Sequence, residues 1–109
     1  IINNTILENF LSPFSTEQKE RILGSFLNEM PERAENCVSL FQEKNYPELR
    51  KEAHTLKSLA KTIGAETLAE QSFFIENLCN TEKFDDLNDN NVDLIDLTQQ
   101  VCAALSSFK

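Results

Sequence analysis

The sequence predicts an all-α protein, an up-and-down four-helix bundle with a short additional N-terminal helix. Apolar residues recur at spacings of three and four along most of the 109-residue chain, which is the period of helices that bury one face. The chain has only two Gly and three Pro, which argues against a sheet protein with many turns. Four long amphipathic segments follow one another with short connections. With 40% hydrophobic residues the chain can bury one modest core, so we expect a single domain over residues 1–109.

The short N-terminal helix is predicted over residues 5–11. Asn4 or Thr5 is suited to cap it, and Ser12 with Pro13 ends it. A helix of this length is not stable alone, so we expect it to pack as a lid over one end of the bundle. The residues that form its apolar face are Ile6, Leu7, Phe10 and Leu11.

A long apolar pattern begins at Thr16 and continues for nearly thirty residues, to Phe41. Ser15 and Gln18 occupy the positions of a capping box at its start. Pro31 lies inside the pattern, and an internal proline either kinks a helix or divides it into two. Because the apolar phase continues across Pro31, we expect one kinked helix.

The next helix, residues 47–64, contains the only histidine of the chain, His54. Gly64 ends this helix, because glycine tolerates the left-handed conformation. A lone histidine is more often hydrogen-bonded inside a core, but the helical phase here favours an exposed one. Opposite His54 lie apolar residues: Leu49, Ala53, Leu56, Leu59, Ala60 and Ile63. Within roughly 60° of His54 lie basic or small residues: Arg50, Lys51, Lys57, Ser58 and Lys61.

Two helices and a loop are predicted for the rest of the chain. In the helix of residues 65–79, Phe73 and Phe74 lie on opposite flanks of the buried stripe, so at least one is expected to be partly exposed. Such an aromatic residue is either accidental or a docking contact. Residues 80–91 are rich in Asn and Asp and predict a loop. The last helix is expected to start near Asn91, with acidic residues in its first turns.

The charge of the chain excludes several classes of partner. With 18 acidic and 10 basic residues the net charge is −8, which repels nucleic acids and anionic membrane surfaces. Against this background, residues 50–61 carry four basic residues and one acidic residue, which suggests a small or local anionic partner. No run of 18 apolar residues and no signal peptide is found. The first residue is Ile, not Met, which suggests a piece of a longer cytoplasmic protein.

The three cysteines predict a reducing compartment. All fall on apolar helical faces, and an odd number cannot pair completely within one chain, so we expect buried free thiols at Cys37, Cys79 and Cys102.

The surroundings of His54 do not match an enzyme site. Hydrolysis by a serine or cysteine needs a nucleophile, a base and an acid that converge, yet Glu52, the acid nearest in sequence, points about 160° away from His54. The spacings typical of zinc and di-iron sites are missing, and no glycine-rich phosphate loop is present. We therefore expect no metal and no nucleotide cofactor.

The same residues suit a nucleophile that accepts a phosphoryl group. A neutral imidazole has a free lone pair that can attack phosphorus. Lys57, one turn along, is placed to neutralise phosphoryl oxygens, and the small Ser58 leaves room for a partner's acidic site. A weaker, screened field would come from Lys61, Lys51 and Arg50. The alternative is that these basic residues form an ordinary solvated helix face.

Residues 54–76, HTLKSLAKTIGAETLAEQSFFIE, resemble the signature of histidine phosphotransfer (HPt) domains, the intermediates of multistep two-component phosphorelays. The family most often has glycine where this chain has Ser58, although serine also occurs there. The positions that carry the resemblance are the phosphoacceptor His54, then Lys57, Ser58, Ala60, the helix-ending Gly64, Leu68 and Glu76.

The resemblance implies a phosphocarrier. His54 would accept a phosphoryl group from an aspartyl phosphate on one response-regulator receiver domain and pass it to the aspartate of another. It also implies that Mg²⁺ belongs to the receiver and that Arg50, Lys51, Ser58, Lys61 and Gly64 shape the docking face. We expect a monomeric, cytoplasmic domain that is part of a longer hybrid sensor kinase. That parent protein can be anchored in the inner membrane. The alternative is a helical adaptor that binds a receiver or a helical partner without being phosphorylated.

Overall fold

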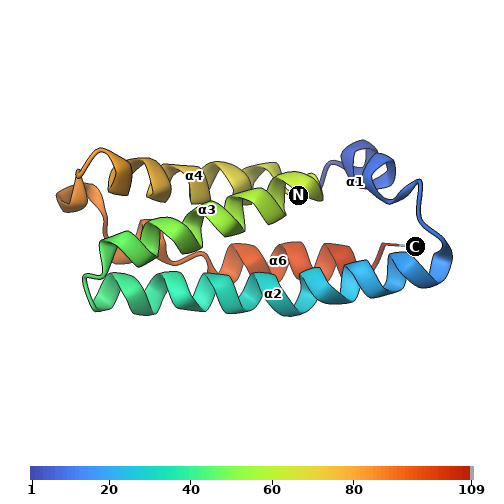
Figure 1. Cartoon of the computed structure of the whole chain (residues 1–109), viewed down its shortest axis with the longest axis horizontal. Coiled ribbons are helices and arrows are strands. Elements are labelled where there is room, and N and C mark those ends of the chain that lie inside the picture. The colour runs from blue at the N-terminus through green and yellow to red at the C-terminus, as the bar shows by residue number, and fades with distance from the viewer. Residues whose placement is uncertain (109) are drawn as a thin grey trace.

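The computed structural model describes residues 1–108, and these form an all-helical bundle with extents of 45 × 20 × 19 Å (Figure 1). Its four main helices are α2 (Thr16–Gln42), α3 (Tyr46–Thr62), α4 (Glu66–Asn80) and α6 (Ile95–Ser106). α3 packs against α2 and α4, and α6 packs against α2. The shorter segments are α1 (Asn4–Leu11), the 3₁₀ turn η1 (Phe84–Asp86) and α5 (Asp89–Val92). The helical bundle with a short N-terminal helix, predicted from the sequence, is confirmed.

α1 lies at one end of the bundle, beside the turn that joins α3 to α4 (Figure 1). Its N-cap is Asn3, one residue before Asn4, the first of the two caps predicted from the sequence. The Asn3 side chain accepts a hydrogen bond from the backbone N–H of Ile6 at 3.2 Å. Leu7 and Leu11 are buried, whereas Ile6 is 38% exposed. The buried face of α1 is therefore narrower than predicted, because Ile6 lies at the edge of the contact with the bundle, beside Gly64, and stays partly exposed.

α2 is a single helix that continues through Pro31, so the alternative of two separate helices is excluded. Its start has the predicted capping box. The Ser15 hydroxyl accepts from the Gln18 backbone N–H, and the Gln18 side chain accepts from the Ser15 backbone N–H.

The last helix is divided, which differs from the single helix predicted to start near Asn91. α5 begins after Asn88, which forms a capping box with Asn91. The side chain of Asp93 then accepts a hydrogen bond from the backbone N–H of Ile95 at 3.1 Å. Asp93 therefore stands at the break between α5 and α6, not in the first turn of one longer helix.

The polar segment between α4 and α6 is held against the bundle by two apolar residues. Phe84 stacks on Tyr46, which begins α3, with ring centroids 4.1 Å apart and an interplanar angle of 7°. Leu87 is buried in the same segment. This packing holds the segment against the start of α3.

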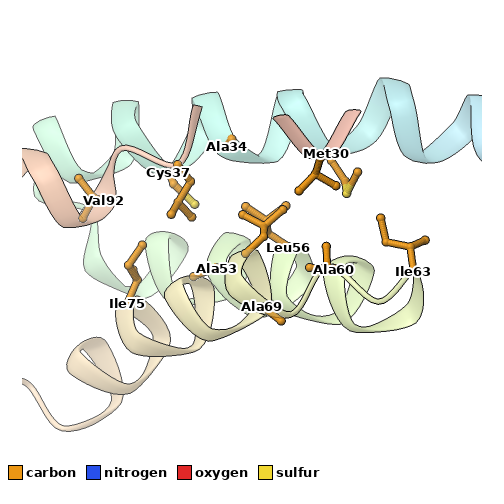
Figure 2. Packing of buried hydrophobic residues seen from close by; sticks show 14 of the residues in the cluster. Met30, Ala34, Cys37, Ala53, Leu56, Ala60, Ile63, Ala69, Ile75 and Val92 are labelled. Carbon is orange, nitrogen blue, oxygen red and sulfur yellow. The ribbon is translucent and has the colours of Figure 1, made fainter. Parts of the chain in front are cut away.

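The core lies between α2 and the pair α3 and α4, where side chains from α2 meet those of α3 (Figure 2). All three cysteines are free thiols, as predicted, and Cys37 and Cys79 are buried, whereas Cys102 is only half-buried, which differs from the prediction. Burial raises the pKa of the Cys37 thiol to about 12. Within residues 1–108, no helix is both long enough and apolar enough to cross a membrane.

Candidate functional site

His54 projects from the middle of α3 into solvent. The helix begins at Tyr46, with Asn45 as N-cap and Pro47 at its second position, one later than predicted. The residues that it buries against the bundle are Leu49, Ala53, Leu56 and Ala60. On the opposite side the His54 side chain is 56% exposed. The helical phase read from the sequence therefore describes the orientation of this helix correctly.

One edge of the His54 ring is held by a buried carboxylate on the neighbouring helix. The His54 Nδ1 atom lies 2.6 Å from Oε2 of Glu76 in α4, whose side chain is only 8% exposed. An ionised carboxylate can only accept hydrogen bonds, so the proton of this bond lies on Nδ1. In the neutral ring the lone pair then lies on Nε2. Glu76 therefore selects the tautomer in which the lone pair of the ring lies on Nε2.

The second oxygen of Glu76 binds Lys57. The Lys57 Nζ atom lies 2.7 Å from Oε1 of Glu76 and 5.2 Å from the centroid of the Phe73 ring. Its side chain is 15% exposed, so its direction differs from the outward one expected from the sequence. The attraction of the buried carboxylate and of the aromatic face draws Lys57 toward α4. Lys57, Glu76 and His54 thus form one hydrogen-bonded chain across the two helices.

The charge of Glu76 is stabilised by these two partners. Burial alone would raise the pKa of Glu76, but the hydrogen bonds from Lys57 and His54 and their charges outweigh it, so the pKa lies below its ordinary value. Glu76 is therefore ionised at neutral pH and remains an acceptor for both partners. A positive charge that develops on the imidazole would meet a fixed negative charge at 2.6 Å.

The other residues predicted for the site divide into two groups. Ser58, Lys51 and Lys61 are exposed on the His54 side of α3, whereas Arg50 is half-buried. Lys51 pairs with Glu48 at 3.2 Å within the same helix. The small Ser58 leaves the surface open one turn beyond the imidazole.

Gly64 has a structural role that the resemblance did not imply. Its φ of 78° ends α3 in the left-handed conformation, as predicted. Its carbonyl accepts a hydrogen bond from the backbone N–H of Asn3 at 2.8 Å. A Cβ atom at this position would lie 2.6 Å from the carbonyl oxygen of Asn3, so only glycine lets α1 approach this closely.

Glu76 is the site residue that sequence reasoning did not select. It matched the family pattern, but no contact with His54 was assigned to it. The available signal was an acidic residue next to Ile75 on the buried stripe of α4, because a buried carboxylate requires partners. Glu52, the acid nearest to His54 in sequence, does point away and pairs with Arg33 of α2 at 3.0 Å. Within residues 1–108, no cluster of three His, Cys, Asp or Glu residues could hold a metal ion.

The described residues thus form a helical bundle that presents one oriented imidazole to solvent. The model of the Hpt domain family matches residues 21–108, most of the chain, and the chain belongs to this family. Hpt domains are phosphocarriers of two-component signalling, and they interact with receiver domains. Searches of curated proteins and of solved structures gave no significant match.

Proposed function

We propose that this chain is a phosphorelay carrier in which His54 accepts a phosphoryl group from an aspartyl phosphate of one receiver domain and passes it to the aspartate of another. The observation that carries the proposal is the Glu76 contact, which directs the lone pair of an exposed imidazole outward through Nε2. Family membership supports the carrier role itself.

The proposed chemistry is an in-line exchange of one bond for another. The Nε2 atom of His54 attacks phosphorus, the N–P bond forms, and the bond between phosphorus and the aspartyl oxygen breaks to release the carboxylate. The ring keeps its Nδ1 proton and becomes cationic, and Glu76 at 2.6 Å neutralises this charge. Transfer to the second receiver is the same step in reverse. Mg²⁺ would be supplied by the receiver, and the chain itself would need no cofactor.

Lys57 is proposed to neutralise charge on the phosphoryl oxygens, and in the free protein it is held one turn from His54 by Glu76. Contact with a phosphoryl group requires only that the flexible lysine side chain exchange one anionic partner for another. The fixed imidazole of His54 would serve to position the reacting atoms, and the lysine side chain beside it would serve to stabilise charge.

The proposal is tested by following label between two receivers. Radiolabelled phosphate on one purified receiver should appear on this chain and then on a second, unlabelled receiver added with Mg²⁺. ATP with Mg²⁺ should not label the chain. Binding of receivers without any labelling would instead support a non-phosphorylated adaptor, and labelling from ATP would require an enzyme.

A further inference from the structure

Two groups of α4 hold the amine of Lys57 in the free protein. The Nζ atom lies 2.7 Å from Oε1 of Glu76 and 5.2 Å from the centroid of the Phe73 ring, and the lysine side chain is only 15% exposed. A charged hydrogen bond and a cation–π contact at one amine restrict a side chain that is otherwise flexible. By contrast, Lys51 and Lys61 on the same helix are exposed. We call the set of Lys57, Glu76 and Phe73 the lysine latch.

The latch engages the lysine that the proposed function assigns to the phosphoryl oxygens. Nδ1 is the ring nitrogen of His54 that faces Glu76, at 2.6 Å. A phosphoryl group on Nε2 therefore projects from the other edge of the ring. To bind this group, the amine of Lys57 has to give up its contacts with Glu76 and Phe73.

The charges at the site favour this exchange once His54 is phosphorylated. A phosphoryl group carries between about 1.5 and 2 negative charges at neutral pH, whereas Glu76 carries one. The departure of Lys57 also leaves the buried carboxylate of Glu76 with a partner, because the phosphorylated ring is cationic and keeps its Nδ1 proton. The buried charge is therefore never unpaired, which would be costly.

We propose that the lysine latch is closed in the free chain and opened by phosphorylation of His54, so that its contacts lower the affinity of the histidine for the phosphoryl group. This inference rests on the proposed function. A contact made in only one of two states stabilises that state alone, and here it is the unphosphorylated one. A lysine without a latch would hold the phosphoryl group more firmly. The latch thus keeps the group easy to pass on, and Phe73 is a positioning residue that acts through Lys57.

The first test measures the equilibrium of phosphoryl exchange with a receiver. Receivers from the source genome are phosphorylated with acetyl phosphate and Mg²⁺, and the one that labels the parent chain fastest is used. The ratio of the forward to the reverse kcat/KM gives the equilibrium constant for phosphorylation of the chain. A contact made only in the transient complex changes both rates by the same factor and cancels from this ratio. The ratio therefore reports on the latch and not on docking.

Phe73→Leu should shift this equilibrium constant toward the phosphorylated chain by about two- to fivefold, the factor that corresponds to one exposed cation–π contact. Leucine keeps an apolar side chain at this position but has no aromatic face for the amine. Phe74→Leu is the matched control. Phe74 lies on the same helix and is 44% exposed, compared with 52% for Phe73, and it should leave the equilibrium constant unchanged.

The second test observes the lysine itself and needs no receiver. NMR of a chain with carbon-labelled lysine follows the ε protons of Lys57, which are assigned by their absence from the spectrum of Lys57→Arg. The Phe73 ring should shift these protons upfield in the parent chain and in Phe74→Leu. The shift should be lost in Phe73→Leu, and also in the parent after phosphoramidate transfers its phosphoryl group to His54 and releases ammonia. His54→Gln treated with phosphoramidate should keep the shift.

Several results would overturn the inference. These are an equilibrium constant for Phe73→Leu equal to or below that of the parent, the same rise in Phe74→Leu, or a Lys57 signal that phosphorylation of His54 leaves unchanged. If phosphoramidate labels His54 and opens the latch but no receiver exchanges phosphate with the chain, the proposed function fails while the latch stands. If His54 takes a phosphoryl group from neither source, both proposals fail.

Discussion

Replacement of Glu76 by glutamine should impair transfer by changing the tautomer of His54. Lys57 can only donate hydrogen bonds, so the glutamine oxygen should turn toward Lys57. The glutamine NH₂ group then faces Nδ1 of His54 and requires that atom to accept. The ring proton moves to Nε2, which is the atom that must attack phosphorus. The shape of the side chain is nearly unchanged, and the nucleophilic lone pair is lost.

The substitution should have two effects, a loss of stability and a slower transfer, and the structure sets the size of both. The carboxylate of Glu76 accepts bonds of 2.6 and 2.7 Å while only 8% exposed, and each bond to a charged group contributes about 1.5–3 kcal/mol. Glutamine keeps a partner for both neighbours, so we expect a loss of about 2 kcal/mol in the free energy of unfolding, not the full sum. The wrong tautomer gains one neutral hydrogen bond, about 1–1.5 kcal/mol, which lowers the reactive fraction and the transfer rate about five- to tenfold.

Glu52→Gln is the matched control. Glu52 lies on α3 and points away from His54. Like Glu76, it accepts a hydrogen bond from a basic residue, in this case Arg33 at 3.0 Å. It should lose a similar amount of stability and transfer at the parent rate. The assay combines urea unfolding, the rate of transfer from a saturating phosphorylated receiver, and NMR of the ring nitrogens. Equal rates for the two variants, or a proton that stays on Nδ1 in Glu76→Gln, would refute the reasoning.

The effect of Glu76→Gln on the free energy of unfolding should also depend on pH. Because the pKa of Glu76 is lowered on folding, its contribution to stability is complete above the unfolded pKa and is lost as the pH falls through the folded one. The unfolded value is about 4.3. The difference in unfolding free energy between the parent and Glu76→Gln should therefore be constant above about pH 5 and should shrink toward zero in more acidic solution. A difference that persists undiminished at pH 2 would contradict this linkage.

Three further predictions concern other parts of the chain. Gly64→Ala should lose at least about 1–2 kcal/mol, because alanine is strained at a φ of 78° and its Cβ would displace Asn3, and urea unfolding would show this. Ser58→Gln should unfold within about 0.5 kcal/mol of the parent yet transfer on the order of a hundredfold more slowly, because it obstructs close approach; an unchanged rate would place the docking face elsewhere. Cys102 should react with iodoacetamide well before Cys37, whose thiol has a pKa of about 12, as mass spectrometry of timed samples would reveal.

Helical periodicity was sufficient to predict which residues α3 buries. Leu49, Ala53, Leu56 and Ala60 face the core, and from this the exposure of His54 follows without any knowledge of the neighbouring helices. The capping box of α2 and the end of α3 at Gly64 were also readable, because the residues that make these features are adjacent in sequence.

Contacts between helices could not be predicted from the sequence in the same way. Glu76 and Lys57 meet His54 only because of the register in which α4 packs against α3, and periodicity within one helix contains no information about that register. The expectation that Lys57 points to solvent follows from its own helix alone, and a carboxylate from another helix changes its direction. The break between α5 and α6 has a similar origin, since a single side chain, Asp93, stabilises a new helix start inside an apolar pattern that looks continuous.

The most direct test of the central claim is to locate the phosphoryl group on the labelled protein. The chain is labelled by a phosphorylated receiver, and NMR coupling between phosphorus and the ring identifies the bonded nitrogen of His54. The account predicts an acid-labile, base-stable phosphoryl group on Nε2, because Nδ1 is held by Glu76, and no label on a folded His54→Gln variant. A phosphoryl group on Nδ1, or label that remains on His54→Gln, would contradict it.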